Sequence, residues 1–143
     1  MTMEGDLGLA VGGTTYASAV TLAAARASLE QVMTREAYAR TTSLGARLAD
    51  GIDRLIAARG LPWCAYRLGN RSGICLSRIW PRNAVECYEI IDPELSHASR
   101  VFMANRGIWE PIAIHGPSVS FAHEAPHVDR YLAAVEELID AVT

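Results

Sequence analysis

The chain has 143 residues, of which 50% are hydrophobic and 20% are charged, and its formal net charge is −3. This composition suits one compact domain with an ordinary core and argues against disorder of the whole chain. Because the charge is mildly negative, it gives no reason to expect nucleic acid or an anionic membrane as a partner.

Cysteine usage and hydropathy narrow the class of protein further. Cys64, Cys75 and Cys87 are odd in number and share no metal-ligand spacing, so we expect neither a disulfide framework nor a zinc site. No apolar segment approaches membrane-spanning length, and the N-terminus lacks a basic region followed by a hydrophobic stretch. We therefore expect a cytoplasmic protein that does not associate with membranes.

A glycine–hydroxyl turn, Gly12-Gly13-Thr14-Thr15, opens onto a nearly charge-free run that predicts a helix from Tyr16 to Met33. Glycine lets the backbone approach a ligand, the first helical N–H groups are unpaired, and a hydroxyl adds a donor near the positive end of the helix dipole. The turn is therefore a candidate anion site. The alternative, which the spacing alone favours, is that Thr14 or Thr15 only caps the helix.

This first predicted helix is apolar on most sides. Leu22, Leu29 and Val32 recur at helical spacing, while alanines make the other sides small and apolar. Such a helix needs neighbours on most of its faces, so we expect it to leave an apolar patch within this chain.

A second helix is predicted from Thr34, a possible cap with Glu36 in the first turn, up to Gly60. Gly60 and Pro62 predict its end, because glycine accepts the left-handed conformation and proline cannot continue a helix. Its expected buried stripe is Leu44, Leu48, Ile52 and Leu55.

Alternating residues from Trp63 to Leu68 and from Ile74 to Ser77 predict an antiparallel hairpin with turn chemistry at Asn70 to Gly73. No aromatic stacking pattern or nucleic-acid-binding module accompanies the arginines of this region, so they indicate a solvated sheet face. They are Arg67, Arg71, Arg78 and Arg82.

Helices and two short strands are predicted beyond the hairpin. Asn83 and Glu86 form a capping-box pattern for a short helix through Ile91, and Asp92-Pro93 starts a helix that stops at Gly107. Short strands are expected at Ile108 to Trp109 and at Ser118 to Phe121, followed by a last helix from Pro126. The inward positions of that helix are Val128, Leu132, Val135, Ile139 and Val142. The pattern as a whole predicts an α+β domain with a small, mostly antiparallel sheet covered by helices.

The histidines predict no metal site. His123 and His127 have the four-residue spacing of a helical metal pair, but Pro126 between them places His123 before the helix and off the face of His127. We expect a surface or capping role for both.

Other candidate chemistry is equally weak. Glu110 and Glu124 are expected to be solvated charges, because nothing in the sequence brings them together. No nucleophile-elbow pattern surrounds Ser118 or Ser120, so the sequence does not support hydrolase chemistry.

Several segments, taken in order, resemble one enzyme family. They are Gly13-Thr14 through Leu29-Glu30, Leu44-Gly45-Ala46-Arg47-Leu48-Ala49-Asp50-Gly51, Met103-Ala104-Asn105-Arg106-Gly107 and Ser120-Phe121-Ala122-His123. Their order and spacing are similar to the C-terminal part of class III pyridoxal-phosphate-dependent aminotransferases, nearest to glutamate-1-semialdehyde aminomutases. The resemblance implies the small C-terminal domain of the fold-type I PLP-dependent transferase architecture, with residues 1–33 a remnant of the large domain and its linking helix, and residues 34–143 the small domain.

The same resemblance implies a cofactor site in the glycine–hydroxyl turn. In that family the Gly-Thr pair donates to the phosphate of pyridoxal 5′-phosphate held by the other subunit of a homodimer, which implies a contact in trans for Gly13 and Thr14. Relatives usually have Ser-Gly-Asn-Pro after this pair, whereas this chain has Tyr16-Ala17-Ser18-Ala19.

All thirteen basic residues are arginine, so the chain contains no lysine. A pyridoxal-phosphate enzyme needs a lysine amine to hold the cofactor as a Schiff base and to move the proton, and a guanidinium that stays protonated cannot replace it. We therefore expect no catalytic residue in this chain, which would need a large domain supplied elsewhere.

Two functions stay open. The first is the C-terminal part of an aminotransferase or aminomutase, which transfers an amino group between small molecules that the sequence does not identify. The second is a catalytically inactive dimerisation or binding module derived from that fold.

Overall fold

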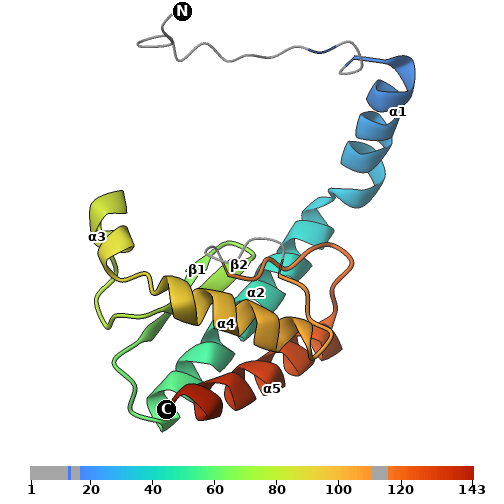
Figure 1. Ribbon diagram of the computed structural model, residues 1–143. Coiled ribbons are helices and arrows are strands. Elements are labelled where there is room, and N and C mark those ends of the chain that lie inside the picture. The colour runs from blue at the N-terminus through green and yellow to red at the C-terminus, as the bar shows by residue number, and fades with distance from the viewer. Residues whose placement is uncertain (1–12, 14–16, 111–115) are drawn as a thin grey trace, which may run out of the picture. The chain divides into compact units, whose positions relative to one another are not determined.

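The computed structural model describes residues 13, 17–110 and 116–143. The chain divides into two compact units, Met1–Thr34 and Arg35–Thr143, which we call the N-terminal and C-terminal units. The elements are α1 (Ala19–Ala27), η1 (Ser28–Val32), α2 (Arg35–Ala58), β1 (Cys64–Leu68), β2 (Arg71–Cys75), α3 (Ala84–Glu89), α4 (Pro93–Ala104) and α5 (Ala125–Val142) (Figure 1).

The helix of the N-terminal unit begins later than the sequence predicts. Its N-cap is Ser18, whose hydroxyl accepts a hydrogen bond from the Thr21 N–H at 3.2 Å. A serine in extended conformation whose hydroxyl accepts from the first turn is a strong cap, so it starts the helix at Ala19. The last turn, η1, is a π-helix in which the Met33 N–H donates to the Ser28 carbonyl. No residue of α1 or η1 is buried.

Helix α2 is the main support of the C-terminal unit. The predicted stripe is confirmed, because Leu48 and Ile52 are buried and the flanking leucines pack against the same core. The helix packs on both strands and on α5. It ends as predicted: Gly60 has a φ of 64°, and the Leu61 N–H donates to the Ile56 carbonyl at 3.2 Å.

The hairpin is present, but the sequence-based prediction placed its turn too late in the chain. Strands β1 and β2 pair antiparallel, with Leu68 opposite Arg71 and Tyr66 opposite Gly73. The turn is therefore the two residues Gly69 and Asn70, and β2 begins where the turn was expected to continue. Gly69 has a φ of 62°, a conformation that glycine supplies at the first position of a tight hairpin turn. The four arginines of this region are exposed, as expected.

The two further strands were predicted wrongly. Residues 108–110 form no strand, and Ser118 makes only an isolated antiparallel bridge with Arg71. Two backbone hydrogen bonds join this segment to the hairpin, from the Ser72 N–H to the Pro117 carbonyl at 3.1 Å and from the Val119 N–H to the Asn70 carbonyl at 2.9 Å. Farther along, Arg40 donates to the carbonyls of Phe121 and His123 at 2.5 and 2.7 Å. The Tyr38 ring also contacts Phe121 edge-on, with 5.0 Å between centroids. Among the described residues the sheet is thus a two-stranded hairpin.

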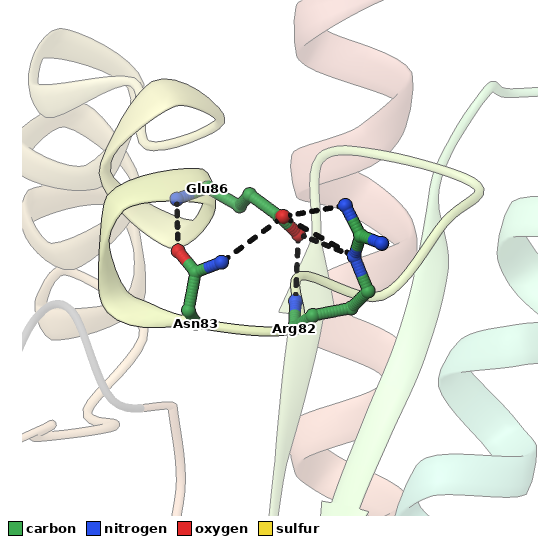
Figure 2. A network of polar contacts seen from close by, with 3 residues as sticks. All are labelled: Arg82, Asn83 and Glu86. Carbon is green, nitrogen blue, oxygen red and sulfur yellow. Dashed lines mark hydrogen bonds and ion pairs between the residues drawn. The ribbon is translucent and has the colours of Figure 1, made fainter.

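Both predicted caps of the middle helices are confirmed. Asn83 accepts from the Glu86 N–H at 3.0 Å, and the Glu86 carboxylate in turn accepts from Arg82 and from the Asn83 side chain (Figure 2). Asp92 accepts from the Leu95 N–H at 2.9 Å, with Pro93 at the first helical position. Helix α3 ends at Glu89, two residues earlier than predicted.

Helix α4 ends in the same way as α2. Gly107 has a φ of 71°, and the Ile108 N–H donates to the Met103 carbonyl at 3.0 Å. Because Ile108 and Met103 both belong to the core, this turn fixes the end of α4 against α5.

Helix α5 closes the core with the predicted stripe, except that Val142 is exposed. The buried cluster joins α2, β1, α4 and α5 and contains Leu48, Ile52, Ile56, Ala65, Met103, Val119, Val128, Ala134, Val135 and Ile139. Helices around a small antiparallel hairpin confirm the α+β class, with a smaller sheet than expected.

Candidate functional site

The predicted phosphate turn is only partly described. Gly13 is exposed, and Thr14 lies outside the described residues. Because Ser18 caps α1, the alternative that Thr14 or Thr15 caps this helix is wrong. The positive end of the helix dipole therefore lies at Ser18 and not directly after the turn.

A pocket of about 420 Å³ lies within the C-terminal unit. Its walls come from β1, β2, α4, α5 and the segments that join them, and most of the side chains that line it are apolar. This volume is in the range of sites that hold small molecules. The pocket is the second candidate site, and the sequence did not predict it.

A carboxylate and a phenol meet in this pocket. The Tyr131 hydroxyl, on α5, donates a short hydrogen bond to Glu110 Oε1, 21 residues earlier in the chain. Burial raises the pKa of Tyr131 well above its usual range, and the neighbouring Glu110 carboxylate raises it further. Tyr131 therefore stays protonated and acts as a donor. The expectation that Glu110 is simply a solvated charge was wrong.

Tyr66 lies on the same pocket. A Cβ built on Gly73 would come within 2.6 Å of the Tyr66 hydroxyl, and one built on Gly116 would do the same, so both glycines make room for this side chain. Burial raises the pKa of Tyr66, while Arg71 lowers it and Glu110 raises it. Tyr66, Arg71, Glu110 and Tyr131 are thus one electrostatic cluster at the pocket wall.

The two C-terminal histidines serve as caps, as expected, but they lie closer together than expected. His123 Nδ1 accepts from the Ser120 N–H at 2.8 Å, and His127 Nδ1 accepts from the Glu124 N–H at 3.0 Å. His123 precedes α5, as predicted, but its ring is in edge contact with that of His127, with 5.6 Å between centroids. In the part of the chain that the structure describes, no three side chains are placed to hold a metal ion.

The cysteines are free thiols. Cys64 and Cys75 are nonetheless directly opposite each other on the hairpin, a pairing that the misplaced turn concealed. Burial, followed by the charge of Cys75, raises the pKa of Cys64, so its thiol is less reactive than an exposed one.

No helix among the described residues is long and apolar enough to cross a membrane.

Comparison with known proteins supports the resemblance seen in the sequence. The chain is 21% identical over 126 residues to glutamate-1-semialdehyde 2,1-aminomutase of Nitrosomonas europaea, which covers 88% of this chain and 29% of that protein. Its fold matches a glutamate-1-semialdehyde aminomutase from Pseudomonas aeruginosa PAO1 in complex with PMP, with a TM-score of 0.84, 25% identity, and coverage of 98% of this chain and 31% of the other.

A β-phenylalanine aminotransferase from Variovorax paradoxus is also similar, with a TM-score of 0.81, 22% identity, and coverage of 93% of this chain and 30% of the other. No family model matches the chain. The chain therefore has the fold of part of these enzymes, and it spans about a third of the length of the relatives that it matches.

Proposed function

We propose that this chain is the small-domain part of a pyridoxal-phosphate-dependent aminotransferase or glutamate-1-semialdehyde aminomutase-like enzyme, and that a large domain supplies the catalytic lysine. One observation carries the proposal: 98% of the chain matches the fold of a glutamate-1-semialdehyde aminomutase, with a TM-score of 0.84. The sequence similarity to an aminomutase covers 88% of the chain and agrees with it. Because the chain has no lysine, it cannot provide the covalent anchor itself.

The assignment of roles follows from this proposal. Pyridoxal phosphate, when bound, acts as the electron sink for amino-group transfer. The Gly13 backbone and the Thr14 hydroxyl would bind its phosphate, from a chain other than the one that holds the lysine. The C-terminal unit would supply a rigid support for that assembly, since its core joins three helices to the hairpin. The partners are thus a second copy of the chain or a large domain.

The test uses this chain together with a separately produced large domain of the Nitrosomonas europaea aminomutase, which carries a lysine if the proposal is correct. We expect the two to form a complex in sedimentation experiments and to retain pyridoxal phosphate through dialysis. Thr14→Val keeps the shape but removes a donor to a charged group, which should weaken cofactor retention by roughly 1.5–3 kcal/mol, or about 10- to 150-fold. Thr14→Ser should be milder.

Thr15→Val is the matched control, because it removes a neighbouring hydroxyl that has no assigned role. Equal cofactor retention by Thr14→Val and wild type would refute the phosphate contact. Failure of the chain to associate with any large domain, together with stable self-association, would favour the alternative of an inactive dimerisation module.

A further inference from the structure

The pocket of the C-terminal unit has an aromatic wall. Trp63, Tyr66, Trp80 and Tyr131 all line it, and they come from β1, from α5 and from the segments on either side of the hairpin. Aromatic rings present a negative face, which attracts organic cations in addition to packing against apolar groups. At about 420 Å³, the pocket has room for a molecule of roughly ten to fifteen non-hydrogen atoms.

The carboxylate of Glu110 lies in this apolar surrounding with few polar partners among the described residues. Glu110 is half-buried, and among the described residues its only hydrogen-bond partner is the Tyr131 hydroxyl, which occupies Oε1. The six ion pairs of the described residues do not include it. A carboxylate removed from water gains most from a cationic donor, because charge-assisted hydrogen bonds are about twice as strong as neutral ones.

Arg71, the other charged group among the described residues of the pocket wall, does not supply that cation. Arg71 is exposed at the start of β2, and its Nε donates to Ser118 Oγ at 3.2 Å. Since its guanidinium is largely in water, it has less to gain from a ligand than the half-buried Glu110 has. Among the described residues that line the pocket, the charge without a cationic partner is therefore negative.

We propose that this pocket binds a small primary ammonium compound with an aromatic or aliphatic body. The ammonium group donates to Glu110, and the body lies among the rings of Trp63, Tyr66 and Trp80. Tyr131 holds the carboxylate in place from the other side, as a donor that does not compete for the ligand.

The probe is 2-phenylethylamine, and its neutral counterpart is 2-phenylethanol, which has the same body with a hydroxyl in place of the ammonium. Binding to the full chain is followed by tryptophan fluorescence, because two of the three tryptophans line the pocket. We expect saturable binding of the amine, at least about tenfold tighter than binding of the alcohol.

Glu110→Gln separates charge from shape. The amide oxygen still accepts from Tyr131, so the variant should fold, and we expect its affinity for the amine to fall about tenfold or more towards that for the alcohol. Glu89→Gln is the matched control, because Glu89 is exposed at the end of α3 and does not line the pocket; it should bind the amine as wild type does. Equal affinity of the wild-type chain for amine and alcohol would overturn the proposal, even if Glu110→Gln failed to fold, and so would an unchanged amine affinity in folded Glu110→Gln.

Discussion

Replacement of Gly45 by alanine tests the close approach of helix α2 to the hairpin turn. Helix α2 passes the hairpin turn so closely that a Cβ on Gly45 would lie 2.8 Å from Asn70 Cα and 2.9 Å from the Gly69 carbonyl oxygen. Both neighbours are backbone atoms, so neither can move aside by a change of rotamer. The hairpin and the helix would have to separate.

Two effects of opposite sign decide the result. Alanine favours the helix over glycine by about 1 kcal/mol, whereas overpacking against a fixed neighbour costs about 3 kcal/mol, at the upper end of the usual range. The net loss of unfolding free energy is therefore about 2 kcal/mol. For a chain of this length, that corresponds to a fall in Tm of roughly 8 °C.

Thermal and urea unfolding, followed by circular dichroism, would measure this loss. Gly51→Ala is the matched control in the same helix, because the three atoms nearest to its Cβ all belong to the half-buried Leu132 side chain and none to the backbone. There the helical gain should offset most of the cost, so we expect a change within about 1 kcal/mol. If Gly45→Ala were as stable as wild type, the close contact between α2 and the hairpin turn would be wrong.

Three further predictions follow from charge, chemistry and exposed apolar surface. The hydrogen bonds from Arg82 lower the pKa of Glu86, so the contacts around the α3 cap should be present above the ordinary pKa of glutamate and lost as the pH falls through the lowered value. The NMR chemical shift of the Arg82 amide, followed against pH, would show this loss. Loss of the contacts already near neutral pH would contradict the prediction. Borohydride treatment with pyridoxal phosphate should label no side chain, because the chain has no lysine; a mass shift on any internal peptide would refute this. The apolar α1 should make the chain self-associate, and a clean monomer over a wide concentration range in sedimentation would show that α1 needs no cover.

The features that the sequence predicted correctly are local. The caps at Asn83 and Asp92 each join a side chain to an N–H three residues later, and the helix end at Gly60 depends on one glycine conformation. Such contacts depend on spacing, which a sequence displays directly.

The features that it missed depend on residues far apart in the chain. The turn at Gly69 is an exception, because a two-residue Gly-Asn loop is a local hairpin signal that was passed over for the similar turn chemistry from Asn70 to Gly73. The segment near Ser118 alternates like a strand, but it meets the hairpin in one isolated bridge at Arg71, about 50 residues earlier, and the chain beyond it is bonded to Arg40, about 80 residues earlier.

The pocket could not have been predicted for the same reason. Glu110 and Tyr131 come from separate segments, and neither spacing nor composition shows that they meet. Only the pairing of Tyr66 with Gly73 could have been inferred, had the turn been placed at Gly69, because the register then follows.

The N-terminal unit has little packing of its own. Helix α1 and the η1 turn that continues it have nine and five residues and bury none of them, while Val20 and Leu22 are 80% and 58% exposed. Isolated helices shorter than about 12–15 residues are marginal in water, because the first turn costs more than it gains. The Ser18 cap and the Arg26–Glu30 ion pair at 2.7 Å add roughly 1 kcal/mol and a few tenths of a kcal/mol, which does not offset that cost. We therefore expect the helicity of α1 to be coupled to association, so that it rises when a second chain covers this helix.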